Sequence, residues 1–165
     1  MIKLNYRVGA ISTVIAVTML AVSSATVFAS ITTPASVLNT NLKTSGNYAW
    51  LGDADPSYNC LAYVVNNYGS WVWPWGTSNP TGAQADTFIA NAGWPYAQPM
   101  NSLNVALYRV ISYGTSSNIK HFALIDGDYT NAKWGQLERL QHYGWNPYTN
   151  SGFQYGEAYH KYAPQ

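Results

Sequence analysis

The sequence predicts an α+β domain over residues 46–165, in which short helices come first and an antiparallel β-meander follows. Two observations carry this prediction. After Cys60, apolar residues recur with a helical period, at positions 61, 64, 65 and 68. Between residues 104 and 143, runs rich in aliphatic and aromatic residues alternate with short Gly, Ser and Asn segments. The two halves therefore indicate a helical part and a sheet part of one domain.

A secretory signal peptide is expected over residues 1–29. It begins with two positive charges and continues with an uncharged, mostly apolar stretch over 8–22. Small residues follow at the −3 and −1 positions of a cleavage site before Ser30. The apolar stretch is shorter than the roughly 20 residues that span a bilayer. We therefore expect a secreted protein of bacterial type, with the extracellular medium or the cell wall as its final location and no stable membrane anchoring after cleavage.

The charge of the remaining chain excludes some partners. After removal of the signal peptide, six Lys and Arg side chains stand against seven Asp and Glu side chains. No basic field is left for binding nucleic acid, so no nucleic-acid partner is expected. Aromatic residues (15%) outnumber charged residues (9%), which suits either an aromatic core or contact with carbohydrate and cell wall. A monomer is expected.

The elements before the sheet follow from local signals. Residues 30–45 are rich in Ser, Thr and Asn and are expected to form a flexible lead-in, and residues 46–58 an irregular segment. A short helix starts at Cys60, with Ser57 or Asn59 as its cap and Gly69 after its end.

The next segment, residues 71–76, contains Trp71, Trp73 and Trp75 and is broken by a proline. Alternate residues of an extended chain point the same way, so the three rings are expected to share one face and to brace the segment. A second helix is expected over residues 84–92.

The β-half has three expected strands, which are separated by turn formers and followed by a tail of weak periodicity. The expected strands cover residues 104–111, 119–126 and 136–143, the turns cover 112–118 and 127–131, and the tail covers 144–165.

Cys60 is the only cysteine of the chain, so no intrachain disulfide is possible. A lone exported thiol is open to oxidation, which raises the question of its purpose. At the start of a helix, the backbone N–H groups favour the reactive thiolate and lower the thiol pKa. Cys60 is therefore a candidate nucleophile, with a small buried apolar residue as the alternative.

His121 is the candidate general base for this nucleophile. It stands near the start of an expected strand whose next residues are apolar, so its ring can be held rigidly. A purely structural histidine is the alternative. The second ring nitrogen of a catalytic histidine needs an orienting acceptor, and His142 or Gln141 at the end of the next expected strand can supply it.

Several motifs carry a resemblance to a known family. They are Tyr58-Asn59-Cys60-Leu61-Ala62-Tyr63, the tryptophan cluster of residues 71–75, and Ala106-Leu107-Tyr108 leading to His121-Phe122-Ala123. This pattern resembles a group of bacterial domains with an Asn-Cys-aliphatic-Ala-aromatic motif, which is similar to the NlpC-type branch of the papain-like cysteine peptidases.

The resemblance covers residues 58–155 and implies a papain-like fold, in which a helix carrying Cys60 packs on a meander carrying His121. It implies Cys60 as nucleophile, His121 as base and His142 as third member. The Cys60 N–H, with Tyr58 or Asn59, is a candidate for binding the oxyanion; both side chains could equally serve in capping or packing.

The function expected from these residues is a secreted cysteine hydrolase of peptide or amide bonds, acting on a peptide or peptidoglycan-type substrate. No cofactor and no metal are expected, since the Asp pairs 53/55 and 126/128 lack the spacing of a calcium loop. The alternative is a non-catalytic wall- or glycan-binding module that presents a row of coplanar Trp and Tyr rings and buries Cys60. An antagonist of other bacteria is a third possibility that the sequence does not separate from these two.

Overall fold

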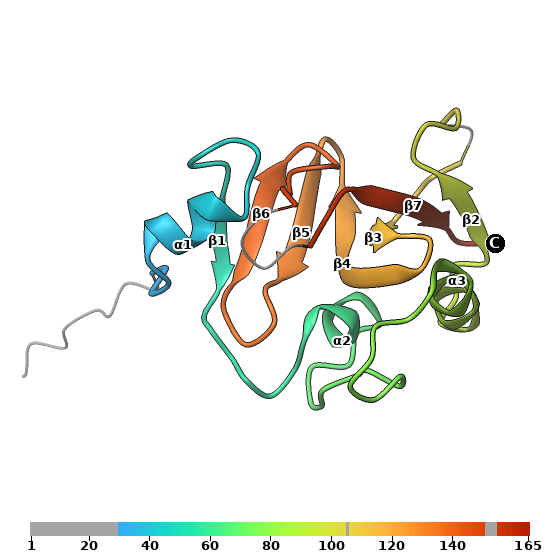
Figure 1. Ribbon diagram of the computed structural model, residues 1–165, viewed down its shortest axis with the longest axis horizontal. Helices are drawn as coiled ribbons and strands as arrows, with labels where there is room; N and C mark the ends of the chain where they lie inside the picture. The colour runs from blue at the N-terminus through green and yellow to red at the C-terminus, as the bar shows by residue number, and fades with distance from the viewer. Residues whose placement is uncertain (1–29, 105, 151–154) are drawn as a thin grey trace, which may run out of the picture.

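The computed structural model describes residues 30–104, 106–150 and 155–165, so the expected signal peptide lies outside the described residues. Within them the chain is α+β, as the sequence predicts, with three short helices and one antiparallel sheet (Figure 1). The helices are α1 (Ala35–Thr40), α2 (Cys60–Val64) and α3 (Gly82–Asn91). The strands are β1 (Ala49–Gly52), β2 (Tyr96–Pro99), β3 (Val110–Thr115), β4 (Asn118–Asp126), β5 (Tyr129–Lys133), β6 (Arg139–Tyr143) and β7 (Ala158–Ala163).

The sheet has the strand order β1-β6-β5-β4-β3-β7-β2, and all pairs are antiparallel. Strands β3 to β6 form the expected meander in its centre. The first and the last strands of the chain extend it: β1 pairs with β6, and β7 lies between β3 and β2. In Figure 1, α1 lies beside β1 at one end of the sheet and α3 beside β2 at the other.

Two of the helices have side-chain caps, and the cap of α2 is one of the two that the sequence indicates. Asn59 caps α2 by accepting a hydrogen bond from the Ala62 N–H at 2.9 Å. Thr81 and Gln84 form a reciprocal capping box at the start of α3. Both expected helices are thus confirmed, although α2 ends earlier than its apolar pattern suggested and α3 begins two residues earlier.

The lead-in and the outer strands differ from the expectation. Where the sequence predicts a flexible segment over residues 30–45, the structure has α1, and Leu38 and Leu42 are buried in the core. Two apolar residues anchor this segment although its composition is polar. Strands β1, β2 and β7 were not expected, because each is short and shows no clear alternation in sequence.

Within the meander, one strand is shifted and one was missed. The expected strand 104–111 is instead β3, which begins at Val110 because backbone pairing with β7 and β4 starts only at Arg109. Residues 127–131, expected as a turn, contain a turn of only two residues, 127–128, and the first three residues of β5. His142 therefore lies two strands away from β4, not on the next one.

The pairing of β4 with β3 is interrupted by a β-bulge next to His121. Tyr113 pairs with His121 and Gly114 with Ile119, so Lys120 is an extra residue on β4. Gly114 permits this bulge, because it has φ +136° and a Cβ there would lie 2.2 Å from the Asn118 carbonyl oxygen. The bulge lies directly beside His121.

Candidate active site

The site lies where β4 and β5 separate. Their pairing covers only the residues from Leu124 to Asp126 on β4 and from Tyr129 to Asn131 on β5. Beyond this point α2 contacts both strands. The start of α2 thus fills the place where β5 would otherwise continue along β4, next to His121. This local divergence positions Cys60 and His121, which are 61 residues apart in sequence.

Cys60 is the first residue of α2, and its environment is set by Asn59. The Asn59 side chain caps the helix and also donates from Nδ2 to the Val72 carbonyl oxygen at 2.8 Å. It therefore ties the tryptophan segment to α2. The oxygen and the nitrogen of this side chain both form hydrogen bonds within the protein. Asn59 therefore serves as a helix cap, which was the alternative to its expected role in binding the oxyanion.

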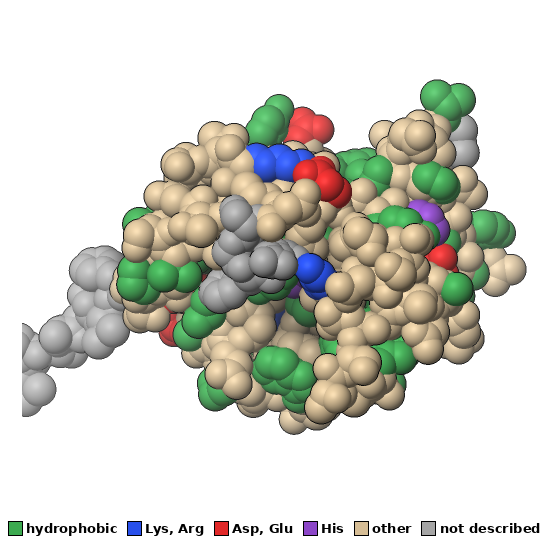
Figure 2. Space-filling model, viewed as in Figure 1, with side chains coloured by type: hydrophobic (Ala, Val, Ile, Leu, Met, Phe, Trp, Pro, Cys, Tyr) green, Lys and Arg blue, Asp and Glu red, His purple; other side chains and the backbone are tan. Residues whose placement is uncertain are grey.

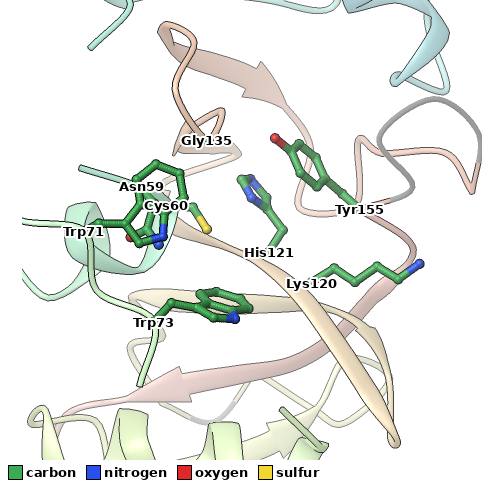
Figure 3. Close-up of a pocket in the computed structure, with 8 residues that line it drawn as sticks. All are labelled: Asn59, Cys60, Trp71, Trp73, Lys120, His121, Gly135 and Tyr155. Atoms are coloured by element: carbon green, nitrogen blue, oxygen red, sulfur yellow. The ribbon is translucent and has the colours of Figure 1, made fainter. Parts of the chain in front are cut away.

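A cavity of about 190 Å³ contains both candidate catalytic residues. Figure 3 shows the Cys60 sulfur pointing toward the His121 imidazole, with the Tyr155 ring on the far side of that imidazole. The other residues that line the cavity are Asn59, Trp71, Trp73, Lys120 and Gly135. The walls are mostly aromatic, and Lys120 is the only charged side chain among these lining residues.

Within the described part of the chain, aromatic rings and not hydrogen bonds hold His121. Tyr155 stacks on it with ring centroids 3.8 Å apart and planes within 9°. Tyr148 meets it edge-on, with centroids 5.1 Å apart. The residue is fully buried, and among the described residues neither of its ring nitrogens has a hydrogen-bond partner. Buried polar atoms without partners are rare and are often found where a reaction uses them.

Burial controls the charge of both groups. It raises the pKa of the Cys60 thiol to about 11, and it outweighs the backbone N–H groups of Phe122, Leu61 and Cys60, which lower the pKa. Burial also holds the pKa of His121 well below its usual 6.5, and His142 adds to this effect. The expectation of a lowered thiol pKa is therefore wrong for this structure, because a five-residue helix compensates too little for desolvation. The site holds a neutral thiol and a neutral imidazole.

His142 lies in β6 and has its own partners. Its Nδ1 donates to the Asn47 carbonyl oxygen at 2.7 Å, and its Nε2 accepts from the Trp134 indole N–H at 3.0 Å. These two bonds fix the tautomer, and burial lowers the pKa to about 4. The Tyr148 ring contacts both histidine rings edge-on. Among the described residues no hydrogen bond joins His142 to His121, so the structure gives His142 a hydrogen-bonded position in the core beside the site.

The remaining candidates lie outside the cavity. The Tyr58 ring packs under the ammonium group of Lys133 and edge-on to Tyr68. Gln141 donates from Nε2 to the Asn131 side chain across the β5–β6 pair, at 3.1 Å. Neither side chain lines the cavity. The structure thus brings together Cys60, His121 and Asn59 from the expected set, and not the other three.

Two site residues, Tyr148 and Tyr155, were missed by sequence reasoning. Both lie in the tail that showed no periodicity, and they reach His121 only through the fold. The one available signal was the high Tyr content of that tail, which did not point to a particular ring.

The tryptophan segment does not form a row of coplanar rings. Trp73 and Trp75 contact each other with centroids 5.2 Å apart and planes at 85°. Trp73 packs on Phe122 and Trp75 on Phe88, whereas 49% of Trp71 is exposed. Two of the three rings brace the segment as expected, and the third lies at the cavity.

The described residues contain no group of three or more His, Cys, Asp and Glu side chains that could hold a metal ion. None of the helices in the described part of the chain has the length and apolar character that crossing a bilayer requires.

Comparison with known proteins identifies one family. Residues 49–163, from the start of β1 to the end of β7, match the model of a domain of unknown function, DUF7689. The chain belongs to this family. The DUF7689 region contains the whole sheet, α2, α3 and every residue of the cavity, and it leaves out α1. No curated protein and no solved structure matches the chain.

Proposed function

We propose that the domain is a secreted cysteine hydrolase of peptide or amide bonds, of the papain-like NlpC type, in which Cys60 is the nucleophile and His121 the base. One observation carries the proposal: a fully buried histidine without hydrogen-bond partners among the described residues faces the only cysteine of the chain in one cavity. A structural histidine normally satisfies its ring nitrogens, as His142 does.

The neutral pair suits general-base catalysis. As the Cys60 sulfur bonds to the substrate carbonyl carbon, the thiol proton passes to a ring nitrogen of His121. When the tetrahedral intermediate collapses, the carbon–nitrogen bond breaks and His121 gives this proton to the leaving amine. Water then attacks the thioester while His121 accepts a proton from it, and the thiol is restored with release of the acid. His121 is neutral near pH 7 and is ready to accept a proton at each step.

The oxyanion would be stabilised by backbone groups. The N–H groups of Cys60 and Leu61 belong to the first turn of α2, where backbone donors have no partner within the helix. The Asn59 side chain is already engaged as a cap and tether, so its part in this step is to hold the start of α2 in place. Tyr148 and Tyr155 replace an orienting hydrogen bond by packing against the His121 ring.

A substrate-independent experiment tests the proposal. With p-nitrophenyl acetate we expect a burst of acylation at Cys60, detected by mass spectrometry, followed by steady turnover. Cys60→Ala should abolish both phases, and His121→Ala should lower turnover by about 10²-fold or more because it removes the base. His142→Gln is the matched control and should keep turnover within a few-fold. Stoichiometric acylation without turnover, unchanged in His121→Ala, would contradict a hydrolase.

The glycan-binding alternative has one observation in its favour, since only 5% of Cys60 is exposed. Its second requirement, a row of coplanar rings, does not fit the perpendicular Trp73 and Trp75. Binding of the Cys60→Ala variant to purified cell walls, together with loss of that binding in Trp71→Ala, would favour this alternative.

Export is part of the proposal, because an extracellular location defines the substrate class. We expect the mature protein to begin at Ser30 after removal of residues 1–29. Intact-mass measurement of the protein recovered from the culture medium checks this. A mass that includes Met1 would contradict export by this signal.

A further inference from the structure

Lys133, the last residue of β5, is a buried cation. Its ammonium group donates to the carbonyl oxygens of Gly135 at 2.6 Å and Leu137 at 2.5 Å, and it lies 5.0 Å from the centre of the Tyr58 ring. The residue is fully buried, and no carboxylate of the described residues lies within ion-pair distance of it. A buried charge without a counter-ion is costly, so its position calls for an anionic partner that forms during function.

The surroundings of Lys133 connect it to the proposed nucleophile. Its acceptor Gly135 lines the cavity that holds Cys60. Its aromatic neighbour Tyr58 precedes Cys60 by two residues, and α2 packs against β5. The ammonium group is thus bonded to one residue of the cavity lining and lies over the ring of a residue just before α2. Neutral His121 supplies no positive charge there before the reaction starts. Lys120 also lines the cavity, but its side chain points away from Cys60 (Figure 3).

We propose that Lys133 is a positioning residue that supplies the fixed positive charge for the site: it stabilises the Cys60 thiolate and the negative charge that develops on the substrate carbonyl oxygen. The second half of this inference depends on the proposed hydrolase, whereas the first half concerns the thiol alone. Among the described residues, Lys133 is the only charged side chain that lowers the pKa of Cys60.

The protonation equilibria of the two groups agree with this role. The Lys133 charge lowers the pKa of Cys60, and a Cys60 thiolate in turn raises the pKa of Lys133. Burial is the largest influence on Lys133 and lowers its pKa to about 8; Asp55 and Glu138 raise that pKa, and Arg139 lowers it. Lys133 is thus charged near pH 7 and loses its charge as the pH rises through 8.

Alkylation of Cys60 by iodoacetamide, followed by mass spectrometry, tests the inference without any substrate. Because Cys60 is the only cysteine, the mass change reports one site. In the wild type the rate should rise about tenfold per pH unit up to pH 8 and then flatten as Lys133 becomes neutral. Lys133→Met should be slower at pH 7 by at least tenfold, which corresponds to one pKa unit.

Lys161→Met is the matched control. Lys161 is also buried, donates to the Ser102 carbonyl oxygen and to Asn104 Oδ1, and lies 4.7 Å from the centre of the Tyr108 ring. It does not act on Cys60, so this variant should label like the wild type. Lys133→Met within twofold of the wild type at every pH would overturn the inference.

If circular dichroism shows that Lys133→Met does not fold, the test compares the pH profiles of alkylation of the wild type and of Lys133→Arg. The arginine keeps its charge, so its rate should continue to climb above pH 8. A wild-type profile that climbs without a break to pH 9.5 would overturn the inference. If the alkylation profiles are as expected but the protein does not turn over the ester, the role of Lys133 toward the thiolate stands and the hydrolase is refuted. If the protein turns over the ester but Lys133→Met alkylates like the wild type, the hydrolase stands and the role of Lys133 is refuted.

Discussion

His121 and His142 are both fully buried, yet their ring nitrogens have opposite surroundings. His142 uses both nitrogens in hydrogen bonds to Asn47 and Trp134, which is how a core histidine is normally accommodated. His121 uses neither among the described residues and is enclosed by tyrosine rings. A single residue type thus has one structural and one candidate catalytic position, and only the partners distinguish them.

The tryptophans of residues 71–75 allow a matched test at the same scale. Trp73 packs on Phe122 and Trp75 and donates from its indole N–H to the Ser78 carbonyl oxygen, whereas Trp71 is half-exposed. We expect Trp73→Ala to lower the free energy of unfolding by about 3 kcal/mol through lost packing. Trp71→Ala should change it by about 0.5 kcal/mol or less. Urea denaturation measures both, and equal midpoints for the two variants would contradict the bracing role.

At the scale of elements, α1 shows how a polar segment is anchored. The Glu138 carboxylate accepts hydrogen bonds from the backbone N–H and the hydroxyl groups of both Thr32 and Thr33. Burial alone would raise the pKa of Glu138, but these bonds lower it to about 2. Leu38 then packs into the core beside β6 residues such as Leu140. One side chain near the start of β6 therefore fixes the direction in which the chain enters the domain.

Glu138→Ala should detach this entry segment. It leaves four donors without their acceptor, and we expect a loss of about 3 kcal/mol in unfolding free energy. Hydrogen exchange should increase in residues 32–42 while β3 and β4 stay protected. Glu138→Gln, which keeps an acceptor oxygen, should lose less. Unchanged exchange over residues 32–42 in Glu138→Ala would show that Leu38 and Leu42 are sufficient to hold the segment.

At the scale of the whole molecule, the seven-stranded sheet has a core on each side. One cluster contains Leu38, Ile111, Trp134 and Tyr148, and the other contains Leu61, Ile89, Phe122 and Tyr162. Cys60 belongs to the second cluster, and the rings around His121 belong to or pack on the first. The candidate site therefore lies between the two cores, at the divergence of β4 and β5. The molecule in Figure 2 has few charged side chains on the visible face, in keeping with its composition.

The two buried histidines should make the fold sensitive to mild acid. Their pKa values are lower in the folded chain than the unfolded value of 6.5, so the unfolded chain binds protons first as the pH falls. Their contribution to stability is complete above pH 6.5 and is lost below it. For His142, a pKa of about 4 corresponds to about 3 kcal/mol at the end of that range.

Urea midpoints measured between pH 7 and pH 4.5 check this expectation. The wild type should lose stability steadily over this range. Glu138 affects stability only at lower pH, between about 4.5 and 2, so it does not contribute to this loss. His142→Gln, whose amide can both donate and accept, should show a smaller slope. A flat wild-type profile down to pH 5 would contradict the neutral, buried state of both rings.

The sequence by itself determined the α+β class, the cap of α2, the presence of an antiparallel meander without all of its strands, and the choice of Cys60 and His121 as candidates. These features rest on local signals: a capping side chain, a helical period, and apolar runs between turn formers. The pairing of β4 with β3 and the position of Cys60 at a helix start followed from such signals.

Only the tertiary structure decided the rest, because those features depend on contacts between distant segments. Strands β1, β2 and β7 are too short to be recognised alone, and they exist because the sheet offers them a free edge. The thiol pKa is set by burial between α2, β4 and β5, which no local pattern reveals. Whether His142 faces His121 or Trp134 is likewise decided by packing, and so is the stacking of Tyr155 on His121.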